Sequence, residues 1–255
     1  MMKTTSPRPT IAILAAVPLE TELIRSFWGP WKISDLGGFH LYRRKSAGMN
    51  LELLHSGIGK ANAAAAATLL ALHQPQALLV LGIGGAFPGS QLQVGDLALA
   101  SSEIFGDEGV LTPQGFHDLE ALHLPLLANF SSPLYNTCPV DAAWLQRAQE
   151  QLAPFAAAAA ITLRTGPFVT VSTCSGTTAG GELLARRTGG ICENMEGAAA
   201  ALVCARHHIP FCELRGISNL VEDRNLARWD LAGAVQIAQQ ALIALLCNEP
   251  GQVSA

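Results

Sequence analysis

The sequence predicts a single α/β domain, in which a mixed and largely parallel sheet lies between two layers of helices. Short apolar runs alternate along the chain with Ala-rich or amphipathic segments, the pattern produced by strand–helix repeats of a parallel sheet. The 255 residues are 49% hydrophobic and 14% charged, which is enough for one large folded core. No linker divides the sequence into two domains. We therefore expect a three-layer α/β/α sandwich over residues 11–247, with a flexible leader at residues 1–10 and a flexible tail at residues 248–255.

The first predicted strand, at residues 11–16, leads directly into a helix. Pro18 suits the first turn of that helix, and Glu20 and Glu22 both fall in this turn. Each carboxylate is either a surface group near the positive end of the helix or a catalytic base over the edge of the sheet. Glu20 is nearer to the strand end, so it is the better candidate for a base.

The next segment is predicted to be a linker at residues 28–36, followed by a hairpin with strands at residues 39–46 and 51–55. After the hairpin, Gly57 and Gly59 open an Ala-rich helix. A glycine loop at a helix start can bring free backbone N–H groups close to an anion or a ribose. Its spacing is not that of a nucleotide P-loop.

A fully apolar strand at residues 77–81 runs into the segment Gly82-Ile-Gly-Gly-Ala-Phe. A strand of this kind is typically buried on both faces. Three glycines in four positions indicate backbone that lies close to a ligand, so Ile83 and Gly84 are candidate binding residues. The segment does not match the dinucleotide fingerprint. A further strand is expected at residues 94–100.

Residues 103–133 are irregular and rich in Gly, Pro and His, and a long loop of this kind is usually functional or contacts a partner. A helix is expected at residues 142–152, a strand at residues 161–171 and a helix at residues 179–187. The polar turn between the last two lies at a strand end, where its backbone can touch a ligand. It contains three candidate binding residues: Ser172, Ser175 and Gly176.

Residues 191–219 predict a strand, a helix and a second strand. Met195 and Glu196 stand where the helix begins, and the second strand ends near Asn219. Glu196 and Asn219 would then lie at the carboxyl ends of two strands, where open α/β sheets bind ligands. Taken singly, Glu196 is a favourable charge at a helix N-terminus and Asn219 a turn residue. Together with Met195 and the glycine segments, they favour a site. A last helix is expected at residues 230–246.

Composition excludes several classes of function. The net charge of −4 argues against nucleic acid or an anionic membrane as the main partner. No apolar run is long enough to span a membrane. The six cysteines are scattered without a C-x-x-C pair, which indicates reduced thiols and a cytoplasmic protein. The sequence contains no cluster typical of a metal site, and we expect no cofactor.

Four segments carry a resemblance to a known family: Ser56-Gly-Ile-Gly-Lys-Ala-Asn-Ala, Gly82-Ile-Gly-Gly-Ala, Glu193-Asn-Met-Glu-Gly-Ala and Arg215-Gly-Ile-Ser-Asn. In this order they resemble the nucleoside phosphorylase and nucleosidase superfamily, over about residues 11–246. Within it, the chain most resembles the futalosine hydrolases of the alternative menaquinone pathway, and next the methylthioadenosine/S-adenosylhomocysteine nucleosidases. The Met-Glu pair and the Arg-x-Ile-Ser-Asn segment are the specific part of the resemblance.

The resemblance implies roles for individual residues. Glu20 matches the base that activates the attacking water, and Met195 and Glu196, next to Asn194, match the pair that lines the ribose. Asn219 departs from the adenine-directed enzymes, which carry an acidic residue there to serve the purine N7. Phe105 is expected in the pocket for the 5′ group, in a region that the family borrows from a neighbouring subunit. We therefore also expect a homodimer or a larger homo-oligomer.

An asparagine at position 219 favours a 6-oxopurine leaving group. Its NH₂ can donate to O6 or N7, where a carboxylate would face O6 with a lone-pair clash. A mispaired buried polar group costs about 1–3 kcal/mol, so this residue alone can bias the choice of base. The resemblance thus implies hydrolysis of futalosine to hypoxanthine and dehypoxanthine futalosine. The alternatives are a methylthioadenosine/S-adenosylhomocysteine or aminofutalosine nucleosidase, a purine nucleoside phosphorylase, and a non-catalytic nucleoside-binding protein.

Overall fold

The computed structural model describes residues 8–45, 48–128 and 132–247. Most of the predicted leader, at residues 1–7, and the predicted tail at residues 248–255 lie outside these ranges. The strands are Thr10–Ala15 (β1), Lys32–Leu36 (β2), Phe39–Lys45 (β3), Asn50–His55 (β4), Ala77–Ala86 (β5), Leu97–Phe105 (β6), Gly109–Thr112 (β7), Gly115–Asp118 (β8), Thr137–Pro139 (β9), Leu163–Thr170 (β10), Cys192–Asn194 (β11) and Phe211–Leu220 (β12). The α-helices are Glu22–Trp28 (α1), Lys60–Ala71 (α2), Ala142–Ala159 (α3), Thr178–Thr188 (α4), Gly197–His207 (α5) and Leu231–Cys247 (α6). Short 3₁₀ helices span Pro18–Thr21 and Leu226–Arg228.

The predicted α/β fold with a central, mostly parallel sheet is confirmed. The strand order is β11-β10-β6-β12-β5-β1-β4-β3-β2, with β9 paired to β6. Strands β4, β1, β5 and β12 are parallel neighbours, and so are β6, β10 and β11. The antiparallel pair of β12 and β6 joins the two groups. Because β11 also pairs with β5, through Cys192 opposite Ala86 and Glu193 opposite Gly85, this end of the sheet closes into a ring.

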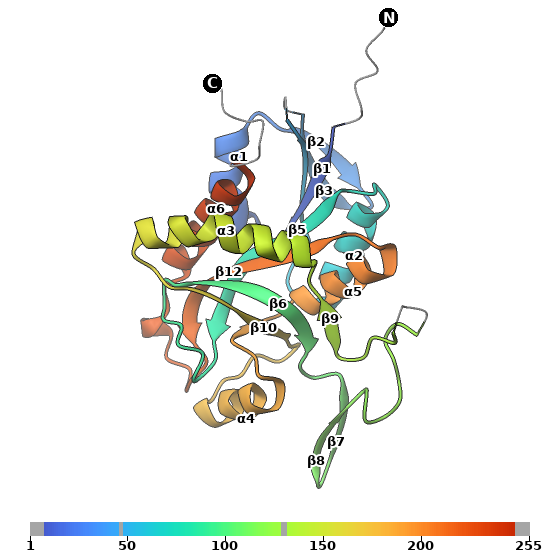
Figure 1. Ribbon diagram of the computed structural model, residues 1–255, viewed down its shortest axis with the longest axis vertical. Helices are drawn as coiled ribbons and strands as arrows, with labels where there is room; N and C mark the ends of the chain where they lie inside the picture. Colours follow the sequence, from blue (N-terminus) through green and yellow to red (C-terminus); the bar gives the residue numbers. More distant parts are fainter. Residues whose placement is uncertain (1–7, 46–47, 129–131, 248–255) are drawn as a thin grey trace, which may run out of the picture.

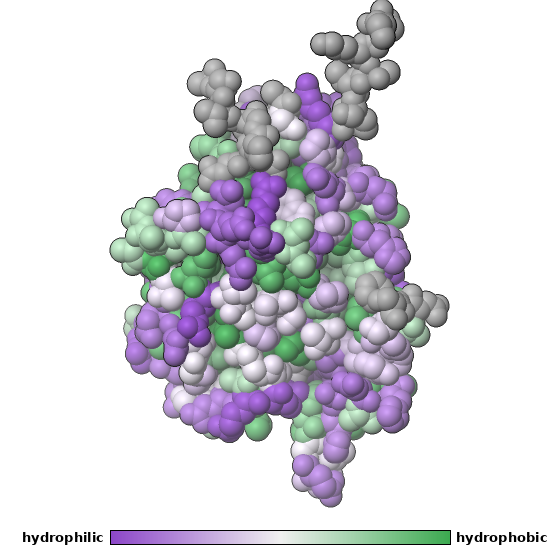
Figure 2. All heavy atoms as spheres, in the orientation of Figure 1, coloured by the Kyte–Doolittle hydropathy of each residue, from purple (hydrophilic) through white to green (hydrophobic). Residues whose placement is uncertain are grey.

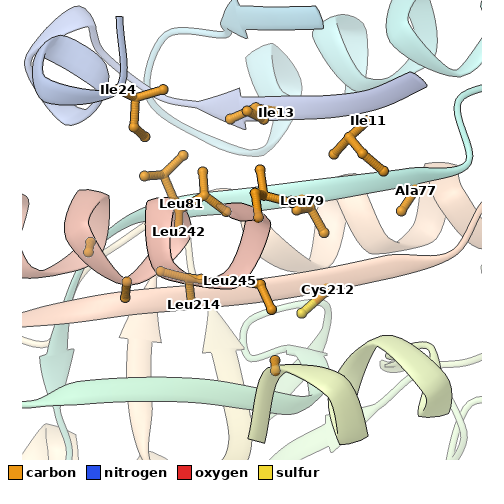
Figure 3. Close-up of a cluster of buried hydrophobic side chains, with 14 of the residues drawn as sticks. Ile11, Ile13, Ile24, Ala77, Leu79, Leu81, Cys212, Leu214, Leu242 and Leu245 are labelled. Atoms are coloured by element: carbon orange, nitrogen blue, oxygen red, sulfur yellow. The ribbon is translucent and has the colours of Figure 1, made fainter. Parts of the chain in front are cut away.

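Helices cover both faces of the sheet (Figure 1). Helices α1, α3 and α6 lie on one face, and α2 and α5 pack together on the other. Ile13, Leu79 and Leu214 come from three neighbouring strands and face α6, where they meet Leu242 and Leu245 (Figure 3). The Ala-rich helices α2 and α5 pack closely on the opposite face. None of the described helices is long and apolar enough to cross a membrane.

Several element predictions were wrong. Residues 28–36 are not a linker, because β2 forms an edge strand there and pairs with β3. The strand predicted at residues 77–81 continues to Ala86, so the glycine segment belongs to β5. The region 103–133 contains the end of β6 and the hairpin of β7 and β8, which protrudes from the body of the molecule (Figure 2). Helix α3 runs through Pro154 to Ala159, beyond the predicted end at residue 152.

The topology brings five strand ends to one edge of the sheet. Strand β1 leads into the 3₁₀ helix of Glu20, β4 into the glycine loop before α2, and β11 into Glu196. Strands β5 and β12 lie side by side at this edge and carry the glycine segment and Asn219. Residues far apart in the sequence therefore meet in one place.

Candidate active site

The carboxylate of Glu20 is held over the edge of the sheet. Its Oε2 accepts hydrogen bonds from the backbone N–H of Ala16 (2.9 Å) and Val17 (3.1 Å), and its Oε1 accepts one from Ile83 N–H (3.2 Å). The residue lies in a 3₁₀ helix and is 5% exposed, whereas Glu22 begins α1 and is exposed to solvent. The structure therefore selects Glu20, of the two candidate carboxylates, as the one that lies in the site.

Burial raises the pKa of Glu20, and the negative charge of Glu196 adds to this effect, while the Arg215 guanidinium opposes it. A raised pKa makes a carboxylate a stronger base near neutral pH, and such shifts are typical of catalytic acids and bases. Its burial, its three backbone donors and this shift together make Glu20 a candidate general base.

Glu196 lies at the N-terminus of α5 and faces two donors. Its Oε1 accepts from Gly59 N–H (3.0 Å), and its Oε2 accepts from Arg215 Nη2 (3.2 Å). The glycine loop before α2 was predicted to approach an anion, and in the structure it approaches the Glu196 carboxylate. The positive ends of two helix dipoles, α2 and α5, therefore lie close to this negative charge.

Asn194 lies behind Glu196 and fixes the start of α5. Its Oδ1 accepts from Glu196 N–H (2.9 Å) and Gly197 N–H (2.8 Å), and it lies 2.9 Å from the Thr170 hydroxyl, whose single proton can be donated either to it or to Glu103. Its side chain is buried, so the contacts of Asn194 are with the protein. Met195, between these residues, is half-buried.

Arg215 joins the two carboxylates, although the sequence alone pointed to no role for it. Its Nη1 donates to Ile83 C=O (2.8 Å) and its Nη2 to Glu196, while Ile83 N–H donates to Glu20. Its Nε donates to Glu213 Oε1 (2.7 Å), and the residue is only 3% exposed. Although burial opposes it, the carboxylates of Glu213 and Glu196 raise the pKa of Arg215, which stays charged. Glu and Arg two residues apart in an apolar strand share one face, a pattern that could have revealed this pair.

The glycines of β5 make room for side chains of the chain itself. A Cβ at Gly82 would lie 2.7 Å from Glu20 Oε1, and one at Gly84 would lie 2.4 Å from Cys192 Sγ. Ile83 contributes its backbone to the Glu20 and Arg215 contacts and is half-buried. The prediction of close backbone approach was made for a ligand; in the structure, neighbouring side chains fill this space.

Asn219 lies further along the same pair of strands. A bulge in β12 between Ile217 and Asn219 places it next to Gly85, where a Cβ would be 3.1 Å from Asn219 Nδ2. Its Nδ2 donates to Leu220 C=O (3.0 Å) and its Oδ1 accepts from Ser218 Oγ (2.9 Å). Because an amide has two N–H donors and two lone pairs, the half-buried Asn219 can make one more hydrogen bond of each kind.

The polar turn after β10 is fastened beside the site. Ser175 donates to the Glu193 carboxylate from its backbone N–H (2.9 Å) and its hydroxyl (2.6 Å). Gly176 C=O accepts from Arg224 N–H (3.3 Å), and Ser172 N–H donates to Asp107 Oδ2 (2.6 Å). The turn follows β10 and is bonded to Glu193 on β11, so it borders the ends of these two strands.

Phe105, which the resemblance places in the pocket for the 5′ group, is 6% exposed within this chain. It packs in the core on the side of α2 and α5, and the centroid of its ring lies 5.7 Å from Lys60 Nζ. Lys60 pairs with Asp107 and Glu108 on the following segment. Phe105 is therefore part of the core of this chain, behind the segment that carries Asp107 and Glu108.

The chain matches the model of the Phosphorylase superfamily over residues 10–248, and it belongs to this superfamily. Futalosine hydrolase of Thermus thermophilus is 32% identical to it over 80% of this chain and 84% of the relative. Futalosine hydrolase of Streptomyces coelicolor is 32% identical over 91% of this chain and 93% of the relative. The 5′-methylthioadenosine/S-adenosylhomocysteine nucleosidase of Halalkalibacterium halodurans is 30% identical over 82% of this chain and 85% of the relative.

Solved structures show the same fold. The 5′-methylthioadenosine/S-adenosylhomocysteine nucleosidase of Helicobacter pylori aligns with a TM-score of 0.79 at 22% identity, covering 94% of this chain and 98% of that one. Futalosine hydrolase of Helicobacter pylori aligns with a TM-score of 0.79 at 22% identity, covering 93% and 97%.

Proposed function

We propose that the protein hydrolyses the N-ribosidic bond of futalosine and releases hypoxanthine. The relatives named futalosine hydrolase and nucleosidase support nucleosidase activity, that is, cleavage of an N-glycosidic bond by water. The observation that carries the proposal is the arrangement of Glu20, Arg215 and Glu196 at one sheet edge, with the amide of Asn219 further along the same strands.

In this proposal the two carboxylates divide the work. Cleavage of a ribosyl–purine bond develops positive charge on the sugar, and a water molecule must lose a proton as it attacks. Glu20, with its raised pKa, takes that proton. Glu196, oriented by Gly59 N–H and Arg215, accepts hydrogen bonds from the ribose hydroxyls, with Met195 against the sugar face. The turn at Ser172, Ser175 and Gly176 borders the base.

In this proposal Asn219 selects which purine base is released. Its remaining N–H can donate to O6 or N7 of a departing 6-oxopurine, which carries negative charge as it leaves. Asn219 is not a general acid, so it suits hypoxanthine, which spreads that charge onto O6. Adenine carries an amino group in place of O6, so it offers this N–H only N7 as an acceptor and loses the bond that a charged O6 would accept.

A panel of substrates tests the proposal. We expect free hypoxanthine from futalosine at a rate independent of phosphate, and slower release of base from aminofutalosine, inosine and methylthioadenosine. A requirement for phosphate would instead identify a purine nucleoside phosphorylase. Faster release of adenine from methylthioadenosine would identify the nucleosidase activity named in the second group of relatives.

Replacement of the proposed base separates an enzyme from a binding protein. Glu20→Gln should lower kcat for futalosine by about 10²–10⁴-fold, because general-base help is worth that much. Gln keeps a similar shape, so binding of futalosine, measured by calorimetry, should remain. The exposed neighbour Glu22 offers a matched control, and Glu22→Gln should leave both quantities unchanged. Equal turnover in the two variants would contradict the role of Glu20.

We further propose a cytoplasmic homodimer or larger homo-oligomer. The hairpin of β7 and β8 extends away from the body (Figure 2). Two neighbouring apolar side chains on β7 are exposed, Leu111 at 80% and Val110 at 40%, and apolar surface gathered on a protruding hairpin suits a contact with a second subunit. Light scattering of the purified chain gives its mass, and a monomer would contradict this assembly.

A further inference from the structure

Two carboxyl groups lie beneath the candidate site and take no part in the contacts proposed for the substrate. They belong to Glu103 on β6 and Glu213 on β12, and both residues are 0% exposed. A Cβ at Gly197 would lie 2.2 Å from Glu103 Oε1 and 2.3 Å from Glu213 Oε2, so both oxygens border the space that this glycine leaves open. Burying two carboxyl groups costs free energy unless their oxygens are hydrogen-bonded and their charge is balanced.

The geometry requires one proton between the two groups. Glu103 accepts from Thr170 Oγ1 (2.7 Å) and Asn194 Nδ2 (2.9 Å). Glu213 Oε2 accepts from no N–H or O–H of the described side chains, so a proton on Glu103 is the donor it needs. Burial, and then the charge of Glu213, raise the pKa of Glu103 well above its usual value. The pair therefore carries a single negative charge near neutral pH.

This pair is connected to the site by two routes. Glu213 Oε1 accepts from Arg215 Nε (2.7 Å), which turns the two remaining nitrogens of the guanidinium toward Glu196 and Ile83 C=O. Glu103 accepts from Asn194, whose Oδ1 caps α5 at Glu196. The orientations of Arg215 and of Glu196 in the proposed mechanism therefore depend on the carboxyl pair.

We infer that Glu103 and Glu213 form a one-proton carboxyl pair, which holds Arg215 with a single negative charge and thereby orients Glu196 and sets the field at Glu20. The inference rests on the proposed nucleosidase function. Glu103 and Glu213 are positioning residues, since they act through Arg215 and Asn194.

Apart from Arg215, one carboxylate and three thiols face the pair, and the charge around it is set by Arg215 and the carboxylates. Glu196 faces it from the start of α5, and three thiols face it from β9, β11 and β12: Cys138, Cys192 and Cys212. Burial raises the pKa of Cys138 and of Cys212 to about 12, and raises that of Cys192 further, so these thiols are neutral. Loss of the negative charge of the pair would leave Arg215 less balanced, and would lower the pKa of Glu20.

A series of near-isosteric variants tests this inference through the acid limb of the pH profile of kcat/KM for futalosine. In Glu103→Gln an amide N–H replaces the shared proton at the loss of the bond from Asn194 Nδ2, and the charge stays on Glu213, so the limb should not move. In Glu213→Gln the charge moves to Glu103, away from Arg215, and the limb should shift to lower pH. In the double variant the charge is gone, and the limb should shift by about one pH unit or more, as the loss of a nearby buried charge commonly does.

A control and a second readout keep the test decisive. Glu52 is also buried, is ion-paired with Arg43 (2.8 Å) and is hydrogen-bonded to His73 (2.7 Å), but it lies outside the site on β4. Glu52→Gln should lower the thermal unfolding temperature without moving the limb. If the Glu213 variants do not fold, infrared difference spectra of the wild type and Glu103→Gln still report the carbonyl stretch of a protonated carboxylic acid, expected in the wild type alone.

The outcomes are distinct. Wild-type protein without nucleosidase activity would refute the proposed function, while the infrared signature would still test the shared proton. An active wild type whose limb stays fixed in the double variant would show that the pair is only structural. Absence of the carboxylic acid band would overturn the shared proton itself.

Discussion

The proposed choice of base depends on the side-chain amide of Asn219. Asn219→Asp exchanges the N–H donors for a second carboxylate oxygen at the same place beside Gly85. We expect the ratio of kcat/KM for futalosine over aminofutalosine to fall by about ten- to a hundredfold, the equivalent of one mispaired buried polar group. The ratio is measured by following release of hypoxanthine and adenine from the two substrates.

A second asparagine serves as the control for this change. Asn50 begins β4, at the opposite end of that strand from the glycine loop, so Asn50→Asp should leave the ratio unaltered. If Asn219→Asp also leaves it unaltered, the amide has no part in selecting the base.

At the scale of single residues, the sequence pointed to polar groups at strand ends, whereas for groups inside strands it could show a shared face but not the contacts made there. Glu20, Glu196 and Asn219 stand next to turn and helix-start signals, which mark the edge of a sheet. Arg215 and Glu213 lie within an otherwise apolar strand, and only the pairing of β12 with β5 and β6 shows what they contact. The same holds for the β5 glycines, because which neighbour fills the space over a glycine depends on tertiary packing.

Among the elements, the N-terminus of α5 connects stability with the site. Asn194 accepts two backbone N–H groups there and also contacts Thr170 and Glu103. Asn194→Ala should lower the free energy of unfolding by about 2–3 kcal/mol, more than a surface cap, since buried partners lose their hydrogen bonds. It should also raise KM for futalosine, because Glu196 is no longer fixed at the helix start.

Helix α3 provides a matched cap away from the site. Asp141 accepts from Trp144 N–H (2.9 Å), and Asp141→Ala should cost about 1 kcal/mol with KM unchanged. Urea unfolding and steady-state kinetics measure both effects. An unchanged KM in Asn194→Ala would separate the cap from substrate binding.

Element predictions succeeded where one local signal decides the outcome. Strand β1 and the first half of β5 are continuous apolar runs, and α6 begins and ends within one residue of the predicted range 230–246. The edge strand β2 was missed because its residues are mostly exposed and alternate weakly. The 3₁₀ conformation at Glu20 was missed because Pro18 suits either kind of first turn, and contacts with the strand end decide between them.

For the molecule as a whole, the alternation of strands and helices was enough to predict the class of fold, but not the closure of one end of the sheet. The ring depends on β11, a strand of three residues whose antiparallel partner β5 is more than a hundred residues away in the sequence. This closure brings Cys192 over Gly84 and Glu193 opposite Gly85, and so places the Met-Glu motif next to the glycine segment. Strand register of this kind is set by tertiary contacts.

The pH dependence of stability is also a property of the whole molecule, and His55 should dominate one part of it. His55 ends β4 and its Nε2 lies 2.6 Å from Oγ1 of the buried Thr21, next to Glu20. Burial, followed by the charges of Arg25 and His40, lowers the pKa of His55 from 6.5 to about 4. Its ring also packs edge-on against Tyr42, 5.4 Å between centroids.

The sign of the effect follows from proton binding. Between pH 6.5 and about 4, the unfolded chain binds a proton at His55 and the folded chain does not, so the free energy of unfolding falls as the pH falls through this window. In His55→Gln this contribution is absent. We therefore expect the variant to gain stability relative to the wild type as the pH is lowered, in urea unfolding at several pH values. The exposed hairpin residue His117 provides the control, and His117→Gln should follow the wild type. A constant difference between His55→Gln and the wild type would mean that His55 does not keep its neutral form in the folded protein, and that the 3₁₀ helix carrying Glu20 is not coupled to pH through it.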